Sequence, residues 1–140
     1  MDERGLPSWA SEYVGIPYKT HGRDRSGCDC WGLFMMVWAE QFGIQAPEYE
    51  GADWHEGQKP QIIGKDAIEF ASRFSPVIPG EERLGDGLLI RMRGHPFHVG
   101  VVMAPGWMLH THEEADSVIE NYRTMTWEKR IGGIYRYEAA

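Results

Sequence analysis

The run from Cys30 to Phe42 is apolar on nearly every side. At helical spacing its large side chains point in all directions, so a helix here must be enclosed by other elements rather than lie on a surface. Asp29 stands at the N-cap position, and Gly43 stands where many helices end in a left-handed residue. The sequence therefore predicts a buried helix around which the rest of the chain packs.

The other segments change from helical to strand periodicity along the chain. Two further helices are expected, at Ser8 to Val14 and at Lys65 to Phe74, with a polar loop at 20–27 and an irregular segment at 47–60. Short β-rich runs follow at 88–92, 98–103, 107–112, 118–122 and 133–137. Because helices come first and strands second within 140 residues, we expect one domain, residues 1–140, of the α+β class, with N-terminal helices packed on an antiparallel sheet.

The overall charge excludes some classes of partner. The chain carries 14 Lys and Arg against 21 Asp and Glu, a formal net charge of −7. That balance argues against a nucleic-acid-binding protein and against a polybasic membrane anchor. No apolar run approaches the roughly 20 residues that cross a bilayer. The residues from Met1 to Pro7 lack the apolar region of a signal peptide, so we expect synthesis in the cytoplasm without one.

Cys30 is the strongest candidate for a catalytic residue. With Asp29 as N-cap, the sulfur of Cys30 would lie near unpaired backbone N–H groups and the positive end of the helix dipole. Both stabilise a thiolate, so we expect its pKa to fall below the free value of about 8.5, as a cysteine nucleophile requires. Gly32 would let another backbone approach this turn. The alternative is a buried thiol without chemistry, which is our interpretation of Cys28.

A cysteine nucleophile needs a base, and two of the expected strands carry histidines. His98 begins one strand, and His110 and His112 lie in the next, after a turn at 104–106. Antiparallel pairing would bring His98 near the other two, one of which could orient it as the third member of a triad. Because His110 and His112 share a face, spacing does not choose between them. The alternative for each is an ordinary solvated residue, which is what we expect of His21, His55 and His95.

Metal and cofactor sites are not expected. Cys28, Cys30, His95 and His98 could form a four-ligand zinc set, but the Cys-x-Cys spacing is unusual and one cysteine would lie in the buried helix. A disulfide between the two cysteines is also not expected, since a single residue separates them. No phosphate-binding glycine motif is present, and Asp86 between two glycines is typical of a turn.

Several short segments form a pattern when taken together. They are Tyr13 to Tyr18, Asp29 to Leu33, Gly85 to Gly87, His98 to Val101, and Leu109 with His110. In order and spacing these segments resemble the NlpC/p60 cell-wall peptidases, from about residue 8 to residue 112. Trp31 replaces the serine of the family's Asp-Cys-Ser-Gly-Leu motif, a variant that resembles the phage-tail branch of the family.

The resemblance implies a papain-like α+β fold and hydrolysis of amide bonds in peptidoglycan stem peptides, commonly between γ-D-glutamyl and diaminopimelate. It implies that Cys30 is the nucleophile, His98 the general base and His110 the orienting third member. Tyr18 matches a tyrosine whose hydroxyl lies near the nucleophile and aids the oxyanion, together with the Cys30 backbone N–H. His112 departs from the family pattern and leaves the choice of third member open.

The phage-tail resemblance also implies a setting. The chain would act at the virion tail tip, in the cell wall or periplasm, with other tail-tip or hub proteins as partners and peptidoglycan stem peptides as substrate. Two alternatives stay open: a structural tail or hub module with a dormant site, and a related amidase or acyltransferase that uses the same thiolate.

Overall fold

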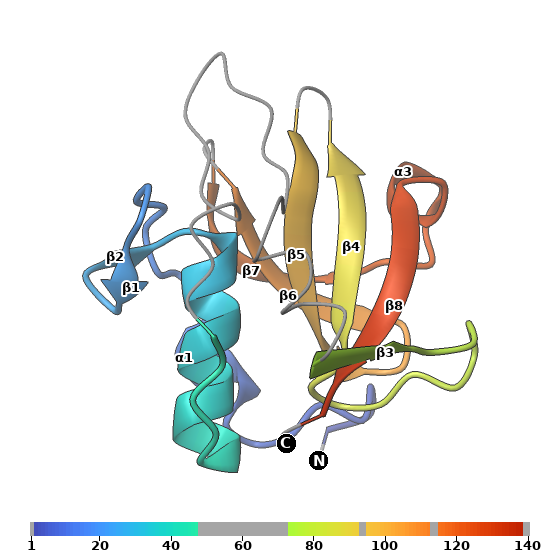
Figure 1. Ribbon diagram of the computed structural model, residues 1–140, viewed down its shortest axis with the longest axis horizontal. Helices are drawn as coiled ribbons and strands as arrows, with labels where there is room; N and C mark the ends of the chain where they lie inside the picture. The colour runs from blue at the N-terminus through green and yellow to red at the C-terminus, as the bar shows by residue number, and fades with distance from the viewer. Residues whose placement is uncertain (1, 48–72, 93–94, 113–114, 139–140) are drawn as a thin grey trace.

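A single antiparallel sheet forms the centre of the molecule, and one long helix lies along one of its faces (Figure 1). The computed structural model describes residues 2–47, 73–92, 95–112 and 115–138. The six strands of the sheet run in the order β3-β8-β4-β5-β6-β7, and β1 and β2 form a small separate hairpin. The strands are β1 Arg23–Asp24, β2 Gly27–Cys28, β3 Phe74–Pro76, β4 Gly87–Met92, β5 His95–Ala104, β6 Trp107–His112, β7 Ala115–Asn121 and β8 Ile131–Tyr137. The helices are η1 Ala10–Tyr13, α1 Cys30–Phe42 and α3 Met125–Glu128.

The buried helix predicted from the apolar run is α1, with the predicted ends. The Asp29 side chain caps it by accepting the Gly32 N–H at 2.8 Å, and Gly43 ends it in the left-handed region at φ 66°. Its aromatic residues form a stacked row, with the Trp31 and Phe34 ring centroids 4.8 Å apart. α1 packs against β5 and β6, as the predicted arrangement of a helix on an antiparallel sheet requires.

The sheet is buried on both faces. Alternate residues along the central strands belong to two separate apolar clusters, as the two-residue period of a strand dictates. Val99 and Leu109 belong to the cluster around α1, whereas Val102 and Met108 belong to a second cluster on the other face. The short helix α3, which the sequence did not predict, adds Trp127 to the second cluster.

The N-terminal segment pairs with the edge strand β7 through backbone hydrogen bonds. The Ser117 N–H on β7 donates to the Ile16 carbonyl at 2.9 Å, and the Gly15 N–H donates to the Ser117 carbonyl at 2.8 Å. The Ser117 hydroxyl, buried at 2% exposure, accepts the Ile16 N–H and donates to the Tyr13 carbonyl. This segment therefore lies along the outer edge of β7.

Three predictions of local structure need correction or lie outside the described residues. The helix expected at Ser8 to Val14 is only the short 3-10 helix η1, with Trp9 rather than Ser8 at its N-cap. Its hydrogen bonds span three residues, and Gly15 at φ 90° turns the chain away. Residues 65–72 of the third predicted helix lie outside the described residues, but that helix does not reach Phe74, which pairs with Tyr137 as the start of β3. The loop expected at 20–27 contains the β1–β2 hairpin.

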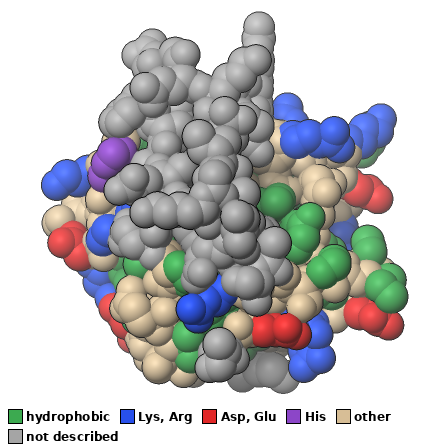
Figure 2. All heavy atoms as spheres, in the orientation of Figure 1, with side chains coloured by type: hydrophobic (Ala, Val, Ile, Leu, Met, Phe, Trp, Pro, Cys, Tyr) green, Lys and Arg blue, Asp and Glu red, His purple; other side chains and the backbone are tan. Residues whose placement is uncertain are grey.

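The described part of the chain contains no helix long and apolar enough to cross a membrane. Figure 2 shows acidic and basic side chains interspersed over the visible described surface, with hydrophobic side chains gathered on the side of β8.

Candidate active site

Cys30 is the first residue of α1, and a network around Asp29 fixes its position. The Asp29 carboxylate accepts hydrogen bonds from the Gly32 N–H at 2.8 Å, from the Arg23 guanidinium at 2.7 Å and from the His21 N–H at 3.1 Å. Asp29 is buried at 4% exposure, and so is Cys30. The carboxylate therefore joins the preceding loop to the first turn of the helix, beside the thiol.

Arg23 is a member of this network that the sequence analysis missed. Its guanidinium forms an ion pair with Asp29 and also donates to the Gly22 carbonyl at 2.9 Å. The positive charge balances a buried carboxylate that would otherwise oppose a thiolate on the next residue. The sequence indicates only a helix cap at Asp29 and a loop at 20–27, where the structure has the β1–β2 hairpin that places Arg23 beside Asp29.

Gly32 admits a close backbone approach, as expected, but the approaching backbone belongs to the chain itself. A Cβ on Gly32 would lie 2.1 Å from the carbonyl oxygen of Gly22. Gly22 is itself enclosed, because a Cβ there would lie 2.2 Å from the Gly27 carbonyl oxygen. Both glycines are thus required for the loop to pack on the helix turn that carries Cys30.

His98 and His110 are joined by a direct hydrogen bond. The Nε2 atom of His98 lies 3.1 Å from Nδ1 of His110. Both side chains are buried, at 4% and 0% exposure. They come from β5 and β6, the strands against which α1 packs, and the antiparallel hairpin predicted from the turn at 104–106 brings them together. Since Nε2 of His98 faces His110, Nδ1 is the ring nitrogen on the side of His98 away from His110.

The hydrogen-bond chain continues from His110 to Glu120 on β7. His110 Nε2 lies 2.5 Å from the Glu120 carboxylate, whose side chain is 39% exposed. Trp127 of α3 packs edge-on against the His110 ring at 4.9 Å between centroids. Burial lowers the pKa of His110, and the hydrogen bond and charge of Glu120 oppose that shift. Sequence reasoning did not find Glu120, whose only signal was its place on a strand after the histidine pair.

His112 lies beside the pair rather than in it. Its ring centroid is 5.9 Å from that of His110 and 6.3 Å from that of His98, and its side chain is partly exposed. Its charge lowers the pKa of His110 further. The hydrogen-bond partner of His98 is thus His110 and not His112, which distinguishes two candidates that the sequence spacing did not.

Tyr18 lies beside the segment that leads into Cys30. It forms an isolated parallel bridge with Cys28, in which the Cys28 N–H donates to the Pro17 carbonyl and the Lys19 N–H donates to the Cys28 carbonyl, each at 3.0 Å. Both cysteines are free thiols. Burial raises the pKa of Cys28 to about 12, so this thiol stays protonated in the folded protein.

The remaining histidines and Asp86 are residues for which the sequence predicts no catalytic role. His21 is exposed, and His95 lies in β5, whereas His55 lies outside the described residues. Within the described ranges no group of three or more His, Cys, Asp or Glu could hold a metal ion. Asp86 does more than form a turn: it is buried and accepts two hydrogen bonds from the Arg136 guanidinium, each at 2.9 Å.

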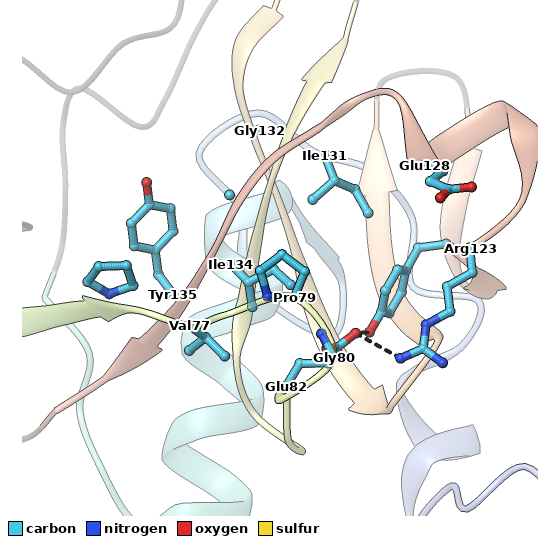
Figure 3. Close-up of a pocket in the computed structure, with 13 residues that line it drawn as sticks. Val77, Pro79, Gly80, Glu82, Arg123, Glu128, Ile131, Gly132, Ile134 and Tyr135 are labelled. Atoms are coloured by element: carbon cyan, nitrogen blue, oxygen red, sulfur yellow. Dashed lines mark hydrogen bonds and ion pairs between the residues drawn. The ribbon is translucent and has the colours of Figure 1, made fainter.

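A large pocket among the described residues lies away from these side chains. It has a volume of about 810 Å³ and lies between β8 and the segment before β4 (Figure 3). Its apolar lining includes Val77, Ile131 and Ile134. The carboxylate of Glu82 on its wall is already paired with the Gly80 N–H, the Tyr122 hydroxyl and the Arg123 guanidinium. Nothing in this pocket corresponds to the predicted chemistry.

Comparisons with known proteins show relatives across nearly the whole chain. The murein DD-endopeptidase MepS/murein LD-carboxypeptidase of Escherichia coli K12 is 24% identical over 120 residues, which are 86% of this chain and 55% of that protein. The gamma-DL-glutamyl hydrolase of Bacillus subtilis is 25% identical over 133 residues, 92% of this chain and 28% of that protein. A probable endopeptidase NlpC homolog of Haemophilus influenzae is 27% identical over 137 residues, 94% of this chain and 64% of that protein. The chain thus spans between about a quarter and two thirds of the length of these relatives.

Solved structures show the same α+β fold. An NlpC/P60 family protein from Bacillus cereus superimposes with a TM-score of 0.66 at 20% identity, over 97% of this chain and 42% of that one. The NlpC/p60 domain of the peptidoglycan hydrolase SagA superimposes with a TM-score of 0.56 at 21% identity, over 96% of this chain and 97% of that one. The sequence profile of the NlpC/P60 family matches residues 15–136. With that match, and with this fold, the chain belongs to the NlpC/P60 family.

Proposed function

We propose that this chain is a cysteine hydrolase that cleaves amide bonds in the peptide stems of peptidoglycan. The observation that carries the proposal is the buried His98–His110 hydrogen bond, on the two strands against which the Cys30 helix packs. A thiol at a helix N-terminus and a histidine oriented by a second polar group are the parts that thiol acyl transfer requires. Family membership supports the proposal, as do the names of the murein endopeptidase and glutamyl hydrolase relatives.

The proposed reaction passes through a thioester. Nδ1 of His98 takes the proton of the Cys30 thiol, and the sulfur attacks the amide carbon. The C–N bond breaks as His98 returns the proton to the leaving amine. Water then attacks the thioester carbon as His98 takes one of its protons. The C–S bond breaks, and His98 returns the proton to the sulfur, which leaves the carboxylic acid and the Cys30 thiol. The Cys30 backbone N–H and the Tyr18 hydroxyl donate to the oxyanion of each tetrahedral intermediate.

We place the cleavage between γ-D-glutamyl and diaminopimelate. The similarity to a gamma-DL-glutamyl hydrolase supports a γ-glutamyl acyl group. Mass spectrometry of diaminopimelate-type muropeptides, incubated with the reduced protein, locates the new termini. We expect a γ-glutamyl carboxylate and a free diaminopimelate amine. Cleavage at another amide would show that the predicted scissile bond is wrong. Release of a small amine from an intact stem would indicate an amidase or acyltransferase.

The matched control for this experiment is the neighbouring cysteine. Cys30→Ala is expected to abolish cleavage. Cys28→Ala removes the other thiol, two positions earlier in the chain, and is expected to leave cleavage intact. Circular dichroism of both variants checks that each is folded. Equal loss in both folded variants, or no cleavage by the folded wild type, would contradict the proposal and favour a dormant site.

The proposal also requires that His98 lies close enough to the Cys30 thiol to take its proton. We expect Cys30 to react with iodoacetamide below the pH at which a free cysteine does, since an imidazolium at His98 stabilises the thiolate. His98→Gln is expected to move this reactivity to higher pH, whereas His21→Gln, at an exposed histidine, is expected to leave it unchanged. Identical profiles in the wild type and His98→Gln would exclude the pair.

We further propose a setting in a phage or phage-like tail, with tail-tip or hub proteins as partners. Trp31 in the nucleophile motif supports this, because it matches the variant of the tail branch. The net charge of −7 also supports delivery by a partner, because the peptidoglycan wall offers an acidic chain no long-range attraction. Proteomics of particles sedimented from cultures that produce the protein tests it. Recovery of the chain only in the particle-free fraction would contradict the tail setting and leave the hydrolase untouched.

A further inference from the structure

We propose that Glu120 is a positioning residue that fixes the tautomers of both buried histidines and so presents the basic nitrogen of His98 to the thiol. The proposal rests on the proposed hydrolase function. It concerns a carboxylate on β7 that lies outside the cysteine, histidine and third polar residue expected from the sequence. The observation that carries it is the continuous chain His98–His110–Glu120, which crosses three neighbouring strands.

The argument begins at the carboxylate. An ionised Glu120 can only accept hydrogen bonds, so the hydrogen between it and His110 belongs to His110 Nε2. A neutral imidazole carries one N–H, which leaves Nδ1 of His110 as an acceptor. The hydrogen between the two rings therefore belongs to His98 Nε2, 3.1 Å away. Nδ1 of His98 is then the ring nitrogen that carries no hydrogen and can accept a proton, and one carboxylate has set both tautomers.

Without the carboxylate this assignment is lost. His110 could then carry its hydrogen on Nδ1 and donate it to His98 Nε2. His98 would in turn carry its hydrogen on Nδ1 and could not accept the proton of a thiol there. A wrong tautomer of the catalytic histidine greatly lowers the rate of a hydrolase. In a serine protease, replacing the orienting carboxylate with an amide lowers kcat about 10⁴-fold.

The surroundings of His110 make Glu120 the group that decides its state. β5 contributes His98, β6 contributes His112, and β7 contributes Glu120, which bears the negative charge. α3 contributes the edge of Trp127, whose ring is also approached by the Arg130 guanidinium at 5.7 Å. The negative charge of Glu120 also stabilises the imidazolium that forms on His98, because only the buried His110 ring lies between them and electrostatic interactions are stronger in a buried network than in water.

Glu120→Gln tests the proposal, because it keeps the shape and removes the charge. We expect kcat/KM on muropeptides to fall about 10- to 100-fold through kcat, with KM unchanged, the size of effect seen when a carboxylate that orients a metal-bound histidine is removed. The pH at which Cys30 alkylation is half-maximal is expected to rise. Glu120→Asp keeps the carboxylate and is expected to retain more of the rate than Glu120→Gln.

Asp116→Asn is the matched control. Asp116 is an exposed carboxylate on the same strand, so this variant removes the same charge without touching His110. We expect its kinetics and alkylation profile to match the wild type. Glu120→Gln with the kinetics and pH profile of Asp116→Asn would overturn the proposal.

The tautomers themselves can be observed independently of activity. Nitrogen-15 NMR of the histidine side chains is expected to show hydrogen on Nε2 of both His98 and His110 in the neutral wild type, and a mixture in Glu120→Gln. If the wild type shows this tautomer pattern but cleaves no muropeptide, the hydrolase function is contradicted and the tautomer assignment stands. A wild type with hydrogen on Nδ1 of His110 would overturn the assignment whatever its activity.

Discussion

A methyl group on Gly32 would lie 2.1 Å from the carbonyl oxygen of Gly22, so the first turn of α1 and the preceding loop touch backbone to backbone. Gly32→Ala must therefore push apart two segments held by Asp29. We expect the free energy of unfolding to fall by about 1–3 kcal/mol, as overpacking at a rigid contact does. Urea unfolding followed by circular dichroism measures it.

The control for this variant is Gly132→Ala on β8. A Cβ on Gly132 would approach nothing closer than 3.6 Å, the distance to the Leu89 carbonyl oxygen. We expect its free energy of unfolding to change by no more than about 0.5 kcal/mol. Equal losses in the two variants would show that the contact with Gly22 is not the cause.

Asp29→Ala is expected to destabilise the protein by more than the loss of an ordinary helix cap. The cap itself contributes about 1 kcal/mol, and Arg23 and the His21 N–H lose the same acceptor. Asp29→Asn keeps an oxygen for the Gly32 N–H and should lose less. Urea unfolding of both variants measures the difference. A loss from Asp29→Ala no larger than that from Asp29→Asn would contradict the network.

Stability is expected to fall at alkaline pH because of Cys28. Burial raises the pKa of Cys28 from 9.0 to about 12, so the folded protein holds this proton over a range where the unfolded chain has released it. The stabilisation is complete below about pH 9 and is lost as the pH rises toward 12, because the unfolded state then binds fewer protons. Urea unfolding at several pH values between about 8 and 10 measures the slope.

Cys28→Ala is the control that isolates this effect. The variant should show a flatter dependence of unfolding free energy on pH than the wild type. A residual slope is expected above about pH 10, because burial also raises the pKa of Tyr122. A wild-type slope no steeper than that of Cys28→Ala would show that the thiol is not protected by the fold.

The ion pair of Asp86 with Arg136 is expected to be sensitive to removal of one partner. Asp86 is 2% exposed and also accepts the Arg83 N–H at 2.8 Å. Arg136→Met leaves this carboxylate buried without its guanidinium, which costs about 3–5 kcal/mol in comparable pairs. The double variant with Asp86→Asn should recover part of the loss, and thermal unfolding measures both. A double variant less stable than Arg136→Met alone would contradict a charge effect.

The parts of the fold that follow from local sequence could be predicted. α1 has its cap and its terminal glycine within the segment itself, and the turn at 104–106 fixes the β5–β6 hairpin. That hairpin brings His98 near both His110 and His112, and only the hydrogen bond in the structure selects His110. Fold class and the approach of the two histidine-bearing strands were therefore accessible without knowledge of distant contacts.

The parts that depend on distant pairing could not be predicted. Arg23 reaches Asp29 only because Gly22 packs on the helix turn, and Glu120 reaches His110 only through the register of β6 with β7. No periodicity marks either contact. η1 is shorter than a helix of its pattern because Gly15 turns the chain away.

The N-terminal segment along β7 has a consequence for the behaviour of the chain in concentrated solution. A sheet's outermost strands can recruit a strand from another molecule through their unpaired backbone groups. Here Gly15 and Ile16 occupy those groups at Ser117 on one side, while the outermost strand on the other side, β3, is three residues long and ends in Pro76, which has no N–H to donate. Both outer margins of the described sheet thus resist strand addition, and self-association by that route is disfavoured.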